Sequence, residues 1–214
     1  MGSKELLPKR NLRFPTTERI KQLQDIFDEA HGDLKDGCIE WRNKNNRRVI
    51  WIPSKAEVVF DFLSYKKISN TISIRDIIEE RTFYDIGAGD GRILFVAREA
   101  GAPEAVGYEI NVGLWSAAKE LHSSNKLLRE FTNIDYLNAD FFKEELDKKP
   151  GLYYIWPDAN TNLDDVCKKI RDETPESLLI VYSKYIASKQ KQLLVCRSEF
   201  IFDNAYDEIG LYIP

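Results

Sequence analysis

Two patterns of apolar residues follow one another in the first part of the chain, one with helical spacing and one with the alternation of a β-strand. The first segment has the helical spacing of three to four residues, and its apolar positions are Ile20, Leu23, Phe27 and Ala30. Thr16 and Thr17 precede it as candidate caps, and Gly32 follows as a stop. Next, "CIEWRN" and "RRVIWIP" alternate apolar and polar residues around the turn-rich "NKNN". This alternation predicts a β-hairpin with one apolar face, formed by Ile39, Trp41, Val49 and Trp51.

The pattern becomes helical again at "SKAEVVFDFLSYKKI". Ser54 and Glu57 have the spacing of a capping box, so we expect a helix that begins just after Pro53. Beyond it, five β-like runs follow, namely "TFYDI", "EAVGYE", "IDYLNAD", "LYYIW" and "SLLIVYS". Helical patterns separate them at 92–100, 112–130, 141–148 and 161–173. Strands that alternate with helices predict an α/β fold, a doubly wound and mostly parallel sheet covered on both faces.

The last segment, "EFIFDNAYDEIGLYIP", differs because two strand-like runs have no room for a helix between them. It predicts a hairpin over 200–213 that adds an antiparallel C-terminal strand to the sheet. We therefore divide the chain into an N-terminal extension of helix and β-hairpin, 1–53, and a main domain, 54–214.

Charge and composition narrow the function. The 214 residues carry a net charge of -4, with 11 Lys+Arg against 8 Asp+Glu in 1–53 (+3) and 20 against 27 in 54–214 (-7). This balance argues against a nucleic-acid partner for the main domain. No apolar run approaches the ~20 residues of a membrane span and the N-terminus has no signal-peptide pattern, so we expect a cytoplasmic protein. Three separated cysteines and two histidines predict no metal site, and nothing indicates the oligomeric state.

Three alternate glycines, Gly87, Gly89 and Gly91, lie between the first of the five runs and the next helical pattern. Such a strand-to-helix turn permits positive φ and brings main-chain N–H groups close to a ligand. A plain turn is the competing interpretation. The NAD fingerprint fits less well, because it requires Gly or Ala where this chain has Arg92.

Acidic residues lie at the carboxyl ends of the first three runs: Asp85 just before the glycines, Glu109 as the last residue of the second run and Asp140 as the last of the third. The carboxyl ends of parallel strands share one crevice, so we expect the three carboxylates to meet there. Glu109 is suited to accept hydrogen bonds from both hydroxyls of a ribose, and Asp140 from an exocyclic adenine amino group. Each acid taken singly is also a candidate helix cap.

Taken as a set, these residues resemble the class I S-adenosylmethionine-dependent methyltransferases over 54–214. The resemblance implies a Rossmann-like, seven-stranded mixed sheet whose last strand is antiparallel and inserted next to the fifth. It also implies that Gly87, Gly89 and Gly91 pack under the methionine and ribose of the cofactor. Asp85 would order the glycine loop, Glu109 would hold the ribose, and Asp140 with Phe141 would border the adenine.

A closer resemblance is to the seven-stranded protein-lysine methyltransferases of archaea and mitochondria, which are distinct from the SET type. "VIWIPSKAEVVFDFL" is similar to their "YVPTP.EVV..ML" stretch, and "YDIGAGDGRIL" to their "YDLGSGDGRIL". The comparison implies that the methionine end of the cofactor is covered by Trp51, Pro53, Ser54 and Glu57. It implies a protein substrate with an accessible lysine. The aromatic "YYIWPDAN" and the 1–53 extension depart from that family's pattern.

The methyl acceptor belongs at the mouth of the crevice, where Trp156 and Asp158 leave the fourth run. An aromatic wall would lower the pKa of a lysine ammonium by desolvation, and a carboxylate would hold the cation. The competing interpretation is a core Trp and an Asp that caps the next helix. Two other functions stay open: methylation of a small amine or metabolite, and a non-catalytic protein that binds S-adenosylmethionine. We further predict that 16–53 forms one wall of the acceptor site, against the alternative of a plain cover on the sheet.

Overall fold

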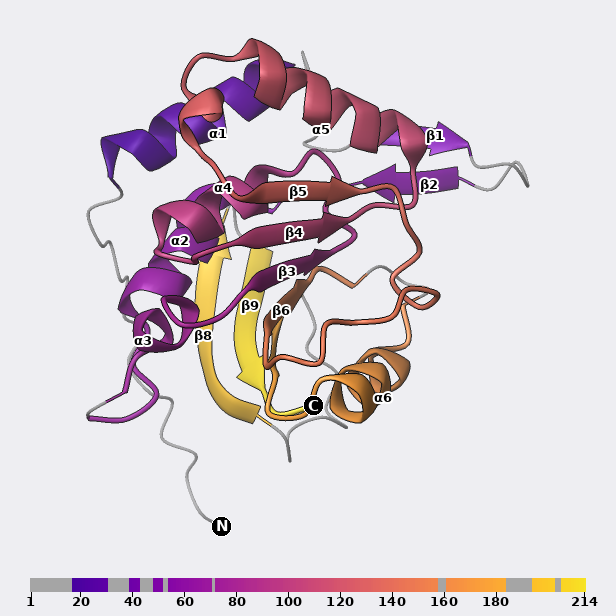
Figure 1. Ribbon diagram of the computed structural model, residues 1–214. Helices are drawn as coiled ribbons and strands as arrows, with labels where there is room; N and C mark the ends of the chain where they lie inside the picture. Colours follow the sequence, from indigo (N-terminus) through magenta and orange to yellow (C-terminus); the bar gives the residue numbers. More distant parts are fainter. Residues whose placement is uncertain are drawn as a thin grey trace.

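A single mixed sheet organises the main domain, as the computed structural model shows (Figure 1). The described residues are 17–30, 39–42, 48–51, 54–70, 72–157, 161–183, 194–202 and 205–214. The helices are α1 Glu18–Ala30, α2 Ala56–Tyr65, α3 Ile74–Ile78, α4 Arg92–Glu99, α5 Val112–Ser124, the 3₁₀ turn η2 Leu128–Glu130, and α6 Leu163–Glu173. The strands are β1 Ile39–Arg42, β2 Arg48–Trp51, β3 Phe83–Ile86, β4 Ala105–Tyr108, β5 Ile134–Leu137, β6 Leu152–Ile155, β7 Leu178–Ser183, β8 Leu194–Phe202 and β9 Ala205–Tyr212.

The sheet has the strand order β5-β4-β3-β6-β7-β9-β8. The strands from β3 to β7 pair in parallel, whereas β9 is antiparallel to both β7 and β8. This confirms the prediction of a mixed sheet whose last strand is antiparallel and lies beside the fifth strand of the series, β7. It also confirms the C-terminal hairpin, although β8 begins at Leu194, several residues before the predicted range.

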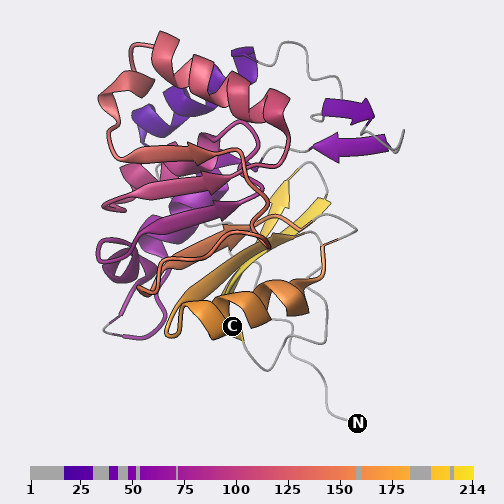
Figure 2. The ribbon, with the colours of Figure 1, turned by 45° about the vertical axis from the view of Figure 1, so that its right-hand side comes forward.

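Two hydrophobic cores cover the two faces of the sheet, because successive strand residues point to opposite sides. Phe83 and Tyr154 belong to the core under α1, α2, α3 and α4, whereas Tyr84 and Tyr153 belong to the core under α6. Figure 2 shows α6 on the side of the sheet opposite to α1 and α5. The predicted doubly wound arrangement is therefore confirmed.

One predicted helix, 141–148, is wrong. The segment forms turns instead, because the Asp140 carboxylate accepts a hydrogen bond from the Phe142 amide (3.1 Å) and competes with helical hydrogen bonds. The amide of Leu146 donates to the carboxylate of Glu173 on α6 (3.1 Å) rather than to a carbonyl of its own segment. The second sheet face thus carries α6 and an irregular segment in place of two helices.

Two helix boundaries also differ from the prediction. The 112–130 pattern divides into α5 and η2, because the side chain of Asn125 accepts hydrogen bonds from the amides of Leu127 (2.9 Å) and Leu128 (3.2 Å). The Ser54–Glu57 capping box is absent: the N-cap of α2 is Lys55, which makes no side-chain cap bond. The short helix α3 was not predicted.

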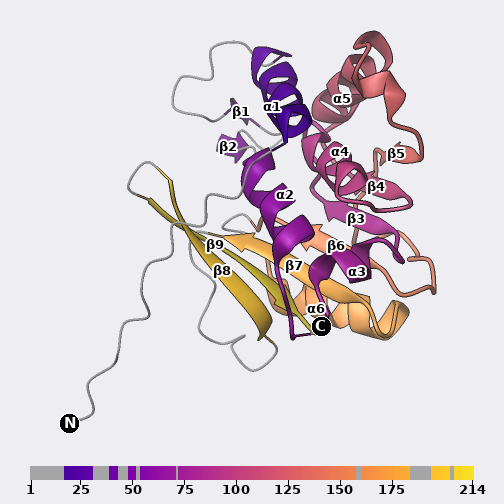
Figure 3. The ribbon, with the colours of Figure 1, turned by 90° about the vertical axis from the view of Figure 1, so that its left-hand side faces the viewer.

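The N-terminal extension packs on the main domain. Helix α1 buries the predicted residues Ile20, Leu23 and Phe27 against α2 and α4, while Ala30 is exposed. Figure 3 shows α1 lying beside both helices. In the hairpin, β1 and β2 pair antiparallel with Ile39 opposite Trp51 and Trp41 opposite Val49, which confirms the predicted hairpin. The hairpin lies on the side toward which the arrowheads of β3, β4 and β5 point (Figures 1 and 2). No helix among these described residues has the length and hydrophobicity to cross a membrane.

Candidate functional site

The glycine loop, 87–91, joins the carboxyl end of β3 to the N-terminus of α4. Its three glycines all have positive φ: 79° at Gly87, 56° at Gly89 and 81° at Gly91, which is the N-cap of α4. L-residues with side chains rarely adopt this backbone conformation. The amides of Gly87 and Ala88 both donate to the Tyr108 carbonyl, at 2.8 and 2.9 Å, so the loop is fixed to the end of β4.

Two of these glycines face different surroundings. A Cβ at Gly91 would lie 2.5 Å from a ring carbon of Tyr136, so the helix and β5 pack too closely for any side chain. A Cβ at Gly87 would meet nothing within 4 Å, and Gly87 is exposed. Packing explains the first glycine, whereas the second leaves open space beside the backbone at the edge where parallel α/β sheets bind ligands.

The carboxylate of Glu109 connects the end of β4 to the glycine loop. One oxygen accepts from the Gly89 amide (2.8 Å) and the other from the Asn111 amide (2.7 Å). The residue is 8% exposed, and burial raises the pKa of its carboxyl while these backbone hydrogen bonds oppose the shift. Glu109 therefore holds the loop in place and retains lone pairs for a ligand.

Asp85 is the most isolated charge of the site. It is 2% exposed, and no hydrogen bond or ion pair reaches its carboxylate from the described part of the chain. Burial raises the pKa of this carboxyl well above its ordinary value, and the charges of Asp90 and Glu109 act in the same direction. A buried, unpaired carboxylate is costly unless a cation completes it, which makes Asp85 a candidate partner for a cationic ligand group.

Replacement of Asp85 by Asn should raise the stability of the free protein at neutral pH. The folded-state pKa is raised, so the wild-type free energy of unfolding is highest below the unfolded pKa and falls as pH rises toward the folded pKa. The substitution removes this loss. We expect Tm to increase by roughly 2–4 °C at pH 7, about 1 kcal/mol for a chain of this size, and its pH dependence to flatten. A lower Tm for Asp85→Asn at pH 7 would contradict the assignment.

The sequence prediction missed an ion pair behind the glycine loop. Asp90 and Arg92 are each 2% exposed, and the Arg92 guanidinium contacts the Asp90 carboxylate at 2.9 Å (Nε) and 2.8 Å (Nη2). In the sequence, Arg92 is notable only as a departure from the NAD fingerprint. Its buried position is not visible in the sequence, where an Arg at a helix start is ordinarily solvated.

The third predicted acid, Asp140, follows β5 at the same edge of the sheet, but it interacts with residues of its own turn. Its carboxylate pairs with Lys143 (3.1 Å) and accepts the turn hydrogen bond from Phe142, so the structure brings together Asp85 and Glu109 but gives Asp140 its own partners. Phe141, predicted to border an adenine, is buried in the α6-side core at 4% exposure. Phe142 is 50% exposed.

Several exposed apolar side chains lie near the carboxyl ends of β4 and β5. Ile110 follows Glu109 and is 71% exposed, and Val112 at the start of α5 is 62% exposed. Leu137, the last residue of β5, is also exposed. These positions lie at the end of β5 and just after β4. They are candidates for an apolar ligand contact, and the sequence prediction did not include them.

The residues predicted to cover the methionine end are only partly described. Ser54 is buried at 7% exposure, and its hydroxyl shares a 2.6 Å hydrogen bond with the hydroxyl of Tyr154 on β6. Glu57 is half-buried in the first turn of α2. Trp51 ends β2, but its side chain and Pro53 lie outside the described residues. Ser54 thus anchors the entry of α2 to the sheet, which explains why it does not cap the helix.

Of the two predicted acceptor-site residues, one is described. Trp156 follows β6, is half-buried, and packs its ring 5.1 Å from the ring of Tyr182 on β7. Trp156 therefore packs partly against the core, as the competing interpretation of a core Trp predicts. Asp158 lies outside the described residues. Within the described part of the chain, no group of His, Cys, Asp and Glu side chains has an arrangement that would hold a metal ion.

Comparisons with known proteins identify the fold. No protein-family model and no curated protein sequence matches the chain. Among solved structures, an RNA methyltransferase from Salinibacter ruber in complex with S-adenosyl-L-homocysteine is similar, with a TM-score of 0.52, 20% identity, 76% of this chain covered and 94% of that one. The Escherichia coli protein yhhF, which carries the designation methyltransferase, has a TM-score of 0.54 at 14% identity, with 81% and 98% covered.

A third similar structure is the tRNA (m1A22) methyltransferase TrmK of Bacillus subtilis, with a TM-score of 0.52 at 14% identity, 75% of this chain covered and 65% of that one. At such low identity these similarities establish the fold alone. The chain has the Rossmann-like α/β fold of the methyltransferases.

Proposed function

We propose that this protein is an S-adenosylmethionine-dependent methyltransferase. The observation that carries the proposal is the glycine loop. Its backbone is open at Gly87, Glu109 is anchored beside it, and the buried Asp85 has no partner among the described residues. These residues fit the cofactor. Asp85 would be completed by a cationic group of the methionine part, Glu109 would accept from the ribose hydroxyls, and Ile110 would lie against the adenine.

The cofactor supplies a methyl group on a sulfonium, which is transferred by in-line displacement. The protein's part is to position the acceptor, to exclude water and to leave the accepting atom with a free lone pair. Gly87 and Glu109 would hold the cofactor against the carboxyl edge of the sheet, and Trp156, directly after β6, would lie against the acceptor. No covalent step is required of a side chain.

For the acceptor we propose the lysine side chain of a protein. The support is the resemblance of the 49–63 and 84–94 stretches to protein-lysine methyltransferases, together with the half-buried Trp156 after β6, whose ring packs on the buried Tyr182 of β7. An aromatic wall lowers the pKa of an ammonium by desolvation, which frees its lone pair. The net charge of -7 over 54–214 also favours a cationic acceptor over a polyanion.

RNA is the second candidate acceptor, because two of the structural neighbours are described as RNA or tRNA methyltransferases. One experiment separates the candidates. The purified protein is incubated with methyl-labelled S-adenosylmethionine and, in parallel, with the protein, RNA and small-molecule fractions of a cell lysate. We expect label in the protein fraction on lysine. Label in RNA alone, or in small molecules alone, would contradict the lysine proposal and identify that class as the acceptor. No label in any fraction would indicate a non-catalytic protein that binds S-adenosylmethionine.

The double variant Trp156→Phe, Asp158→Asn tests the acceptor site. Phe keeps an aromatic contact with Tyr182, so the stability cost should stay below about 1.5 kcal/mol. We expect kcat/KM for the acceptor to fall about tenfold, which is roughly 1.4 kcal/mol of transition-state stabilisation, with unchanged affinity for S-adenosylmethionine. Wild-type methylation rates in this variant would place the acceptor elsewhere.

A further inference from the structure

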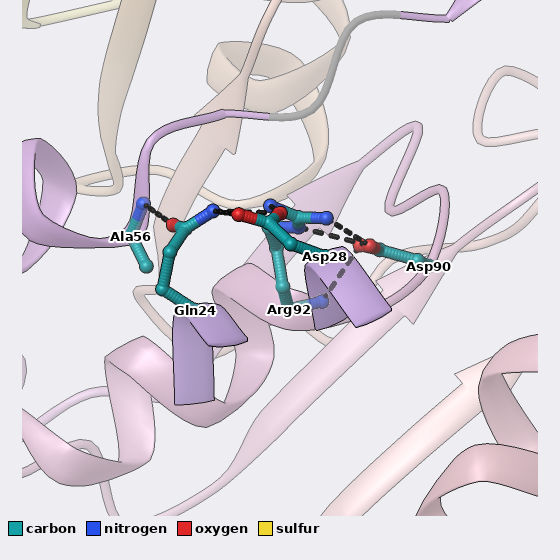
Figure 4. Close-up of polar contacts among 5 residues, drawn as sticks. All are labelled: Gln24, Asp28, Ala56, Asp90 and Arg92. Atoms are coloured by element: carbon teal, nitrogen blue, oxygen red, sulfur yellow. Dashed lines mark hydrogen bonds and ion pairs between the residues drawn. The ribbon is translucent and has the colours of Figure 1, made fainter. Parts of the chain in front are cut away.

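The polar side of α1 contacts the glycine loop directly. Asp28 on α1 accepts an ion-pair hydrogen bond from Nη1 of Arg92 at 2.9 Å, and Arg92 in turn holds Asp90 within the loop (Figure 4). The Arg92 side chain is 2% exposed, whereas that of Asp28 is 48% exposed. A residue of the N-terminal extension thus pairs with a buried charge at the candidate cofactor site.

Gln24, one turn before Asp28, links this pair to a second segment. Its Nε2 donates to both Asp28 carboxylate oxygens, at 2.8 and 2.7 Å, and its Oε1 accepts from the amide of Ala56 at 3.0 Å (Figure 4). Ala56 is the first residue of α2 and lies between Ser54 and Glu57, two of the residues that the resemblance implies for the cover of the methionine end. One helix of the extension therefore joins the two segments that flank the proposed methionine end.

The apolar side of α1 makes this arrangement rigid. Ile20, Leu23 and Phe27 are at most 1% exposed, and the Phe27 ring lies 5.5 Å from the ring of Phe95 on α4. The Arg92 guanidinium also lies over the Phe27 ring at 5.5 Å. Because α1 is packed on both helices, Asp28 has a fixed position relative to Arg92.

The charges explain what this contact does. Arg92 is the one buried cation of the described residues, and three buried carboxylates surround the loop, those of Asp85, Asp90 and Glu109. Asp28 and Asp90 hold the guanidinium on the α1 side of the loop. No ion pair reaches Asp85 from the part of the chain that the structure describes, so this carboxylate can pair with a cationic group of a ligand.

We propose that Asp28, supported by Gln24, is a positioning residue for the cofactor: it holds Arg92 away from Asp85 and orders the glycine loop for the methionine part of S-adenosylmethionine. The inference rests on the proposed function. Helix α1 is accordingly part of the binding machinery and more than a cover on the sheet.

The test measures two ligands against matched variants by calorimetry. S-adenosylhomocysteine carries the amino-acid part, and 5′-methylthioadenosine lacks it. For Asp28→Asn we expect affinity for S-adenosylhomocysteine to fall about fivefold or more and affinity for methylthioadenosine to change less than about twofold, within the usual range of coupling between sites. Gln24→Met should likewise weaken the binding of S-adenosylhomocysteine more than the binding of methylthioadenosine. Asp25→Asn, on the exposed side of α1, is the matched control and should match wild type.

Three results would overturn the proposal. Equal affinities in Asp28→Asn and wild type would show that Asp28 does not act on the site. Equal loss for both ligands would indicate a general structural role. Absence of S-adenosylhomocysteine binding to the wild-type protein would refute the proposed function itself, and this inference with it. Glycine-loop amides that exchange faster in Asp28→Asn than in Asp25→Asn, at equal Tm, would support it.

Discussion

Replacing Glu109 by Ala is expected to reduce the affinity for S-adenosylmethionine more than about 100-fold, because each lost hydrogen bond to a charged acceptor is worth roughly 1.5–3 kcal/mol. The substitution removes the acceptors of the Gly89 and Asn111 amides along with the proposed ribose contact. The fold should persist, since a buried carboxylate is lost from the site without opening either hydrophobic core. Calorimetric titration and thermal unfolding measure the two effects separately.

Glu104→Ala is the matched control. Glu104 immediately precedes β4, at the opposite end of the strand from Glu109, and its carboxylate accepts only a 3.1 Å hydrogen bond from Thr82 among the contacts described. The Glu104→Ala variant should bind S-adenosylmethionine with the same affinity as the wild-type protein. Unchanged affinity in Glu109→Ala, or an equal loss in both variants, would refute the placement of the ribose.

Gly91→Ala should lower the free energy of unfolding by about 2–5 kcal/mol. Roughly 1–2 kcal/mol comes from the left-handed backbone conformation at φ 81°, and about 1–3 kcal/mol from overpacking. The added Cβ would lie 2.5 Å from the Tyr136 ring, which cannot move freely because it is packed against the core at β5. Chemical denaturation measures the loss.

Gly87→Ala separates backbone strain from packing, since it has nearly the same φ, 79°, with nothing within 4 Å of the added Cβ. It should cost only about 1–2 kcal/mol of stability. Its larger effect should be on S-adenosylmethionine binding, because the methyl group would occupy the open space beside the loop. Equal destabilisation by the two variants would mean that contact with Tyr136 does not explain Gly91.

Local patterns in the sequence predicted the strand series and the glycine loop well. The apolar runs around Phe83 and Leu152 are short and bounded by turn residues, and the glycines at 87–91 stand between a strand and a helix, so neighbouring residues suffice for both predictions. Predictions from neighbouring residues failed where a contact with a residue far away in the sequence determines the local structure. Ser54 has the sequence context of a cap, yet its hydroxyl is bonded to Tyr154, 100 positions away.

The same reason accounts for the missed features of the site. The Asp28–Arg92 pair joins residues 64 positions apart, and no spacing rule links them. Phe141 and Phe142 are adjacent and chemically identical, so the sequence offered no basis for deciding which one is buried. The 141–148 helix failed because Glu173 on α6 takes the Leu146 amide. Such choices are made by tertiary packing and not by local propensity.

The most direct test of the central claim is a calorimetric titration of the wild-type protein with S-adenosylhomocysteine. The geometry of the glycine loop, Asp85 and Glu109 predicts saturable binding with one ligand per chain. The absence of any saturable binding under conditions where the protein is folded would contradict the account.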